Sequence, residues 1–157
     1  LQLAEDIKNG MGWEELVERR APQLIANTYP FFSVDTLEYL QKGGRIGKIS
    51  AMAGTMLQIK PIITFALDGQ LQSIAKVRGR QQVMRKLVEM AVDRCGSHKR
   101  YNLAVANGGA PEEMETVRQM LTTALPDYDR IWDGEIDGTL SVYIGDGVLG
   151  AAVQVLD

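Results

Sequence analysis

The sequence contains a single cysteine, Cys95, and a single histidine, His98. One cysteine excludes a disulfide within the chain. Cys95 falls on the apolar side of a predicted helix with no cluster of activating groups, so we expect a small core residue. His98 stands in a polar stretch, where we expect solvent exposure, and no second histidine is present to build a metal site or a histidine-based triad.

Long apolar runs and an excess of positive charge are also missing. No segment approaches the roughly 18–20 apolar residues of a membrane helix, and the first residues mix acidic and apolar side chains instead of forming a signal peptide. The net charge of -3 argues against general binding to nucleic acid or anionic membranes. The acidic residues are scattered, with no pair suited to acid–base chemistry. We therefore expect a cytoplasmic protein with no cofactor, no metal and no catalytic residues of its own.

The chain of 157 residues, of which 45% are apolar, has the size and composition of one soluble domain. Its first eight residues form the pattern of a helix already in progress, with Asn9 and Gly10 as the stop signal and no cap before it. We therefore expect residues 1–157 to be a fragment of a longer protein, cut within an element.

Hydrophobic periodicity and turn residues predict an intermixed order of helices and strands. Helical patterns cover residues 14–27, 36–41, 50–57, 81–95 and a segment that opens at Pro111. Strand patterns cover residues 29–34, 61–66, 71–77, 103–106, 130–132, 140–143 and 151–155, with a hairpin turn at residues 68–69. Pro22 should strain or bend the first of these helices. The pattern predicts an α+β fold with a mixed or antiparallel sheet covered by helices.

A glycine-rich segment, Gly43-Gly44-Arg45-Ile46-Gly47-Lys48, is the first candidate site. Its glycines permit positive φ and close backbone approach, and Arg45 can donate two hydrogen bonds to a carboxylate or acyl phosphate. The alternative is a helix C-cap and a tight turn, with Arg45 paired to an acidic residue of its own domain. The spacing excludes a nucleotide-binding P-loop.

A second candidate is the predicted helix 50–57, in which small residues alternate with Met52 and Met56 and which Ile59 follows. Methionine adapts its shape to a flexible apolar ligand, so these residues suit the wall of an apolar tunnel. The small side chains equally suit close packing of the helix on the sheet.

A basic cluster comprises Lys76, Arg78, Arg80, Arg85 and Lys86. Such a run is commonly a solvated face. In a chain with net negative charge, it is also a candidate docking patch for an acidic partner, through Lys76, Arg78 and Arg80 in particular.

Residues 35–48, with the sequence DTLEYLQKGGRIGK, resemble the signature of the DegV family, which is close to TLEYLxKGGRIGK. The resemblance continues through Ile59-Lys60-Pro61-Ile62, the hairpin, and Lys76-Val77-Arg78-Gly79-Arg80 at the start of a long helix. These pieces stand in the order and spacing of the family, and the resemblance extends over essentially the whole chain.

The resemblance implies a two-domain carrier that holds one long-chain fatty acid in a tunnel between its domains. This chain would be the C-terminal domain, and the missing N-terminal domain would supply Ser and Thr contacts to the carboxylate. Some members present the acid to a separate fatty acid kinase subunit. On this resemblance the ligand would contact Gly44, Arg45, Met52, Met56, Ile59 and Tyr143.

Two positions depart from the family pattern. Many members carry an HTGPG-like turn before the last strand, where this chain has Tyr143-Ile144-Gly145-Asp146-Gly147. The strand that ends at Ala106 is often followed by histidine, and here Asn107 follows. Tyrosine and asparagine can hydrogen-bond a carboxylate but carry no positive charge, and Asp146 would add a negative charge nearby. The head-group contacts are therefore expected to differ from those of the family.

Overall fold

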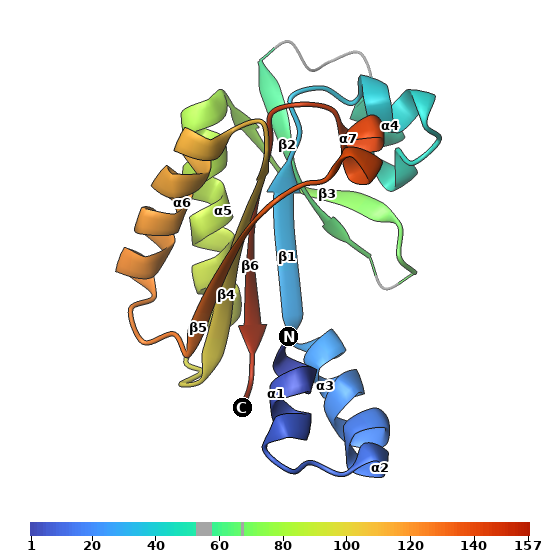
Figure 1. The fold of residues 1–157 in the computed structure, drawn as a ribbon. Coiled ribbons are helices and arrows are strands. Elements are labelled where there is room, and N and C mark those ends of the chain that lie inside the picture. The colour runs from blue at the N-terminus through green and yellow to red at the C-terminus, as the bar shows by residue number, and fades with distance from the viewer. Residues whose placement is uncertain (53–57, 67) are drawn as a thin grey trace.

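The computed structural model describes residues 1–52, 58–66 and 68–157 (Figure 1). The elements in chain order are α1 (Gln2–Lys8), α2 (Trp13–Glu15), η1 (Leu16–Arg20), α3 (Ala21–Ala26), β1 (Thr28–Ser33), α4 (Glu38–Lys42), η2 (Gly47–Met52), β2 (Ile59–Phe65), β3 (Leu71–Arg78), α5 (Arg80–Cys95), β4 (Tyr101–Gly108), α6 (Pro111–Ala124), β5 (Arg130–Glu135), α7 (Gly138–Ile144) and β6 (Val148–Val155). The predicted α+β class is confirmed.

The strands form one six-stranded sheet in the order β3-β2-β1-β6-β4-β5. All neighbouring strands are antiparallel except β4 and β5, which are parallel. The predicted hairpin joins β2 and β3, and the last strand, β6, lies between β1 and β4 near the middle of the sheet. The sheet is therefore mixed, as the sequence pattern predicted.

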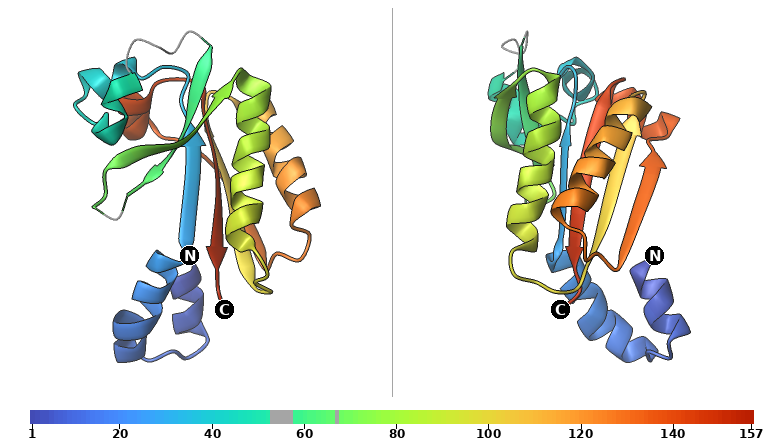
Figure 2. Two further views of the ribbon diagram at one scale, coloured as in Figure 1. Left: turned by 180° about the vertical axis from the view of Figure 1, so that it is seen from behind. Right: turned by 90° about the vertical axis from the view of Figure 1, so that its left-hand side faces the viewer.

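Helices α5 and α6 cover one face of the sheet, as the two views of Figure 2 show. Side chains that alternate along the central strands, such as Leu103 and Val105 on β4, bury themselves beneath these helices. Cys95 lies in this core and is 1% exposed, as predicted. Burial raises the pKa of its thiol, so the reactive thiolate is disfavoured.

Among the described residues, helices cover the opposite face of the sheet at its two ends. At one end α4, η2 and α7 pack over a second buried cluster: Val34, Leu37, Leu40, Ile49, Ile63 and Val148. At the other end lie the N-terminal helices α1, α2 and α3 with the π-helical turn η1, here called the N-terminal arm (Figure 1). Between these two covers lies a stretch of the sheet over which none of the described helices packs.

Two predicted elements differ in the structure. Residues 140–143, expected as a strand, lie in helix α7, which begins where the Asp137 carboxylate accepts a hydrogen bond from the backbone N–H of Leu140 at 3.1 Å. An N-cap of this kind favours a helix where four residues of alternation are too short to decide. The predicted helix 14–27 is divided into α2, η1 and α3, and Pro22 lies in the first turn of α3, where a missing N–H costs little.

The predicted helix 50–57 is only partly covered by the structure. A 3₁₀ helix, η2, ends at Met52, and residues 53–57 lie outside the described part of the chain. Within the described ranges, none of the helices combines the length and the apolar composition that crossing a lipid bilayer requires.

Arg20 holds the N-terminal arm to the sheet. Its Nε donates to the Asp6 carboxylate at 2.8 Å. Its Nη1 donates to the side-chain carbonyl of Gln23 and to the backbone carbonyl of Leu156. Burial would raise the pKa of Asp6, but hydrogen bonds from Arg20 and Gln2 more than offset it and lower the pKa. Both side chains of the pair are only 11% exposed, so this ion pair is better shielded from solvent than a surface pair.

We predict that Asp6→Asn destabilises the folded chain by about 2 kcal/mol, because a partly buried guanidinium loses its charged partner. Since the pKa of Asp6 is lower in the folded state, the ion pair contributes fully above the ordinary aspartate pKa and is lost as the pH falls below it. Urea unfolding at a series of pH values should therefore show a shallower loss of stability in acid for the variant. Asp68→Asn, at the exposed pair with Lys48, is the matched control and should have little effect. Equal losses for the two variants would contradict this role.

Candidate ligand pocket on the open face of the sheet

The stretch of sheet between the two helical covers is the floor of a partly open apolar pocket of about 820 Å³. Six side-chain positions on alternate residues of three adjacent strands form the apolar floor: Pro30, Phe32, Ala104, Ala106, Gly150 and Ala152. They pair across the strands in two rows, Phe32–Gly150–Ala106 and Pro30–Ala152–Ala104. Because four of the six are glycine or alanine, the floor lies close to the backbone and leaves room for a ligand.

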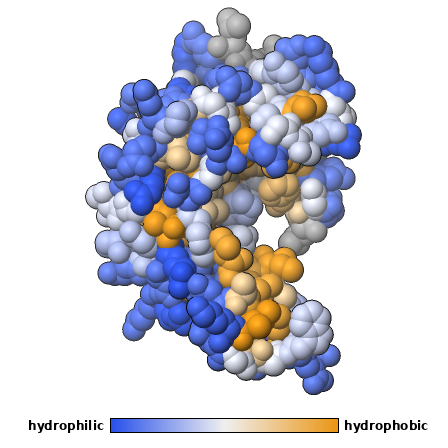
Figure 3. All heavy atoms as spheres, in the orientation of Figure 1, coloured by the Kyte–Doolittle hydropathy of each residue, from blue (hydrophilic) through white to orange (hydrophobic). Residues whose placement is uncertain are grey.

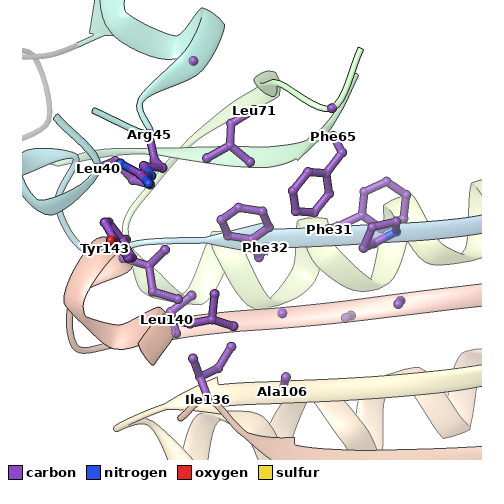
Figure 4. Close-up of a pocket in the computed structure, with 18 of the residues that line it drawn as sticks. Phe31, Phe32, Leu40, Arg45, Phe65, Leu71, Ala106, Ile136, Leu140 and Tyr143 are labelled. Atoms are coloured by element: carbon purple, nitrogen blue, oxygen red, sulfur yellow. The ribbon is translucent and has the colours of Figure 1, made fainter. Parts of the chain in front are cut away.

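Larger apolar side chains form the walls of this pocket. Phe65 on β2 and Leu71 on β3 border it from the hairpin (Figure 4). Ile136, which precedes α7, and Leu140, which lies in α7, border it from the other side. The rings of Phe32 and Phe65 lie 6.1 Å apart at 40°. In Figure 3 the molecule is hollowed between the hairpin and the N-terminal arm, and apolar residues border the hollow. The pocket suits a flexible hydrocarbon better than a polar ligand.

One end of the pocket carries a positive charge. The Arg45 guanidinium lies 4.7 Å from the centre of the Tyr143 ring, within the range of a cation–π contact. One Arg45 nitrogen donates to the carbonyl of Gly43 at 2.7 Å, which leaves further N–H donors for a ligand. Arg45 and Tyr143 line the pocket together at the end away from Phe65 (Figure 4). An anionic head group on a hydrocarbon chain would find its counter-charge here.

The glycine-rich segment forms the helix C-cap that its sequence allowed, and it also borders the pocket. Helix α4 ends at Gly43, Gly44 follows with φ of +68°, and the Arg45 N–H donates back to the carbonyl of Leu40, which is a helix C-cap. Gly44 and Arg45 also line the pocket. Gly47 has φ of +55°, and a Cβ there would lie 2.7 Å from the carbonyl oxygen of Leu71, so glycine is required where the turn crosses β3. No acidic partner of Arg45 is found among the described ion pairs.

Of the other predicted wall residues, Ile59 is the one whose side chain the structure describes. Ile59 begins β2, is 41% exposed and does not border the pocket. Met52 ends η2, and Met56 lies outside the described residues. The structure therefore gathers Gly44, Arg45 and Tyr143 from the predicted set, and it leaves the methionines as predictions.

Two residues that depart from the family pattern, Asn107 at a histidine position and Asp146 at the proline position, have different surroundings. Asn107 is buried near the end of β4, where its side-chain carbonyl accepts a hydrogen bond from the backbone N–H of Ala110 at 3.0 Å. Asp146 lies against Gly109, whose missing side chain makes room for the carboxylate, and it does not border the pocket. His98 is exposed, as predicted, and contacts Asp157 at 3.2 Å. Over residues 1–52, 58–66 and 68–157 no cluster of His, Cys, Asp and Glu is placed to hold a metal ion.

The predicted basic patch is divided by the fold. Arg80 is half-buried and donates to Glu113 at 2.6 and 2.8 Å, with Asp35 3.5 Å away. Lys76 and Arg78 are exposed two residues apart on β3, at the edge of the sheet, and Arg78 is held by the side-chain carbonyl of Gln58. Only Lys76 and Arg78 of the three are therefore positioned to meet a partner, since Arg80 belongs to an internal ion-pair network.

Most of the pocket was missed by sequence reasoning. The floor residues come from three strands that are far apart in the chain, and their shared face depends on β6 lying between β1 and β4. A trace is visible afterwards in the alternation of small residues at positions 104 and 106 and at positions 150 and 152. A single strand with such a pattern also occurs where backbones pack closely, so the pattern alone does not predict a pocket.

Known proteins resemble this chain along its whole length. A DegV domain-containing protein of Clostridium acetobutylicum is 34% identical over 152 residues, which are 97% of this chain and 53% of that protein. A DegV family protein from Thermus thermophilus, described as binding fatty acid, superposes with a TM-score of 0.91 at 23% identity over 99% of this chain and 55% of its own. A stearic acid-binding protein from Eubacterium ventriosum gives a TM-score of 0.85 at 24% identity, over 98% and 53%.

The chain thus spans about half the length of the curated relatives that it matches. The family described as "Uncharacterised protein, DegV family" matches residues 1–155, which include the glycine-rich turn, the pocket floor and the last strand of the chain, β6. This chain belongs to the DegV family.

Proposed function

We propose that this chain is part of a cytoplasmic lipid carrier and binds the tail of one long-chain fatty acid in the pocket. The observation that carries the proposal is the combination of an apolar pocket of about 820 Å³ with an arginine at one end. The carboxylate would meet Arg45 and Tyr143, and the hydrocarbon would lie along the apolar floor toward Pro30 and Ala152. We propose binding without catalysis by this chain.

Two further considerations support a fatty acid as the ligand. Each buried methylene contributes about 0.8 kcal/mol, so an apolar floor supplies affinity without a specific polar contact along the tail. The solved relatives from Thermus thermophilus and Eubacterium ventriosum are described as binding fatty acid and stearic acid. Their similarity to this chain supports the proposal through the shared fold.

We also propose that the chain is one half of a two-domain protein, whose other half covers the pocket and completes the head-group site. The pocket is partly open, and the chain spans about half of its curated relatives. The N-terminal arm exposes large apolar side chains, among them Trp13 at 75% and Ile25 at 77%, which a covering domain would bury.

A second candidate function is docking to an acidic protein, such as the ATP-binding subunit of a fatty acid kinase to which the carrier would present its ligand. Lys76 and Arg78 favour it because they are exposed together on an edge strand. Positive charge at such a site would mainly raise the rate of association.

We predict that the full-length protein purifies with one fatty acid per molecule. Native mass spectrometry should show a mass increment that disappears on denaturing extraction, and lipid analysis of the extract should identify the acid. The isolated chain 1–157 is the comparison, and it should bind more weakly because one side of its pocket is open. An empty full-length protein that also fails to take up added acids would contradict the proposal.

We predict that Arg45→Gln in the full-length protein weakens binding of palmitic acid about tenfold or more, because a charge-assisted hydrogen bond is worth about 1.5–3 kcal/mol. Binding of hexadecanol should change little, since the alcohol has no carboxylate to pair. Isothermal titration with both ligands makes the comparison. Lys48→Gln, which removes a nearby exposed charge outside the pocket, is the control. An equal loss for acid and alcohol would assign Arg45 a structural role only.

We predict that Lys76→Glu combined with Arg78→Glu slows association with the fatty acid kinase subunit of the same organism about tenfold at low salt. The difference should shrink as salt is added, because exposed charges are screened. Stopped-flow association measures both effects. Lys8→Glu together with Lys99→Glu is a matched change of charge at two exposed residues outside the basic cluster. An unchanged rate for the first variant would reject this docking site.

A further inference from the structure

The apolar floor ends abruptly at a row of hydrogen-bonded polar side chains. One row beyond Pro30–Ala152–Ala104 in the same register stand Thr28, Gln154 and Asn102, here called the polar ladder. They occupy alternate positions on the same three strands, so they face the same side of the sheet as the floor. The pocket borders both floor rows and no residue of the ladder.

Hydrogen bonds fix the ladder in place across the sheet. The Gln154 side-chain N–H donates to the Thr28 hydroxyl at 2.9 Å, and that hydroxyl donates to the carbonyl of Leu24 at 2.6 Å. The side-chain N–H groups of Asn102 donate to the side-chain carbonyl of Gln154 at 3.2 Å and to that of Gln2, on α1, at 3.0 Å. The ladder thus joins three strands to the N-terminal arm, which stands over it.

Beyond the ladder the environment is polar and charged. A separate polar pocket there is bordered by Gln2, Glu5, Asp6, Asn9, Arg20, Arg100, Asn102, Asp129 and Arg130. Asn102 is 1% exposed, and its side-chain carbonyl oxygen accepts no hydrogen bond from the described residues. A hydrocarbon end pushed into this region would separate paired polar groups without replacing their hydrogen bonds. Extension of an acyl chain past the apolar floor into the ladder therefore costs free energy.

We propose that the polar ladder sets the longest acyl chain that this carrier accepts, with the methyl end of the ligand stopping at Gln154. The inference rests on the proposed function, because it requires the fatty acid tail to lie along the floor from Arg45. On β6 the pocket extends from Val148 to Ala152, about 13 Å at 3.3 Å per residue. Every methylene that fits on this length adds about fourfold in affinity, and a methylene beyond it meets the ladder and adds nothing.

The test titrates delipidated full-length protein with even-numbered saturated acids from decanoic to docosanoic acid. For the wild type, affinity should rise with chain length up to one length, here called the break. For longer acids the affinity should stay level or fall. In Gln154→Ala the break should move to longer acids, and the acid two carbons beyond the wild-type break should bind about tenfold tighter than to the wild type. Asn102 and Thr28 keep another hydrogen-bond partner each in this variant, so the sheet is expected to fold.

Two further variants separate the ladder from general effects. Thr28→Val keeps the side-chain shape while removing the hydroxyl that Gln154 contacts, and it should shift the break in the same direction. It also serves if Gln154→Ala fails to fold, which thermal unfolding reports. Gln72→Ala, the same chemical change at a residue that borders neither pocket, should leave the profile unchanged.

The outcomes separate the two proposals. A wild-type profile that rises without a break, or folded ladder variants with the wild-type break, would overturn the role of the ladder and leave fatty acid binding intact. A wild type that binds none of the acids would overturn the proposed function itself, and with it the role of the ladder.

Discussion

The alternation of side chains along β1, β4 and β6 is the constraint on which the rest of this structure depends. In a strand, successive side chains point to opposite faces, and these three strands pair in one register. Residues such as Leu103 and Leu149 therefore face α5 and α6 and form the main core, while Ala104 and Gly150 face the other way. A shift of one residue in β6 would exchange the two sets, exposing the core and filling the pocket.

The face away from the core is divided into an apolar part and a polar part, and the division follows the helical covers. The glycine-rich turn and α7 enclose the end where Arg45 stacks on Tyr143. The N-terminal arm stands over the other end, where Arg20 and Gln2 join it to the strands and to the C-terminal residues. Polar contacts can anchor the arm because the side chains on this face of the sheet are polar from Gln154 onward. Anchoring of the arm and the end of the pocket therefore depend on the same row of side chains.

Several features could be predicted from the sequence: the fold class, the hairpin, the long helix that ends at Cys95, and the residues Gly44, Arg45 and Tyr143 at the charged end of the pocket. Most of these depend on local signals: an Asp-Gly turn, a helical stripe of apolar residues, or a glycine-rich segment flanked by a cation. Tyr143 was expected only from its place in the family pattern. The helix α7 and the pocket floor could not be predicted. The first depended on a cap at Asp137 that outweighs a short alternating pattern. The second depended on the pairing of β6 with β4 and with β1, and β1 lies more than a hundred residues before β6 in the chain.

Tyr143 replaces a residue of the family pattern at the proposed head-group end of the pocket. At a position where many family members carry histidine, this chain has an aromatic ring whose face the Arg45 guanidinium covers. A histidine could share the charge of a carboxylate, whereas an uncharged tyrosine orients the guanidinium and offers one hydroxyl. Gly43 makes this stacking possible, because a Cβ there would lie 2.5 Å from the Tyr143 ring. In the proposed site Arg45 supplies the positive charge and Tyr143 orients it, whereas a single histidine could do both. The stacking of Arg45 on Tyr143 requires glycine at position 43.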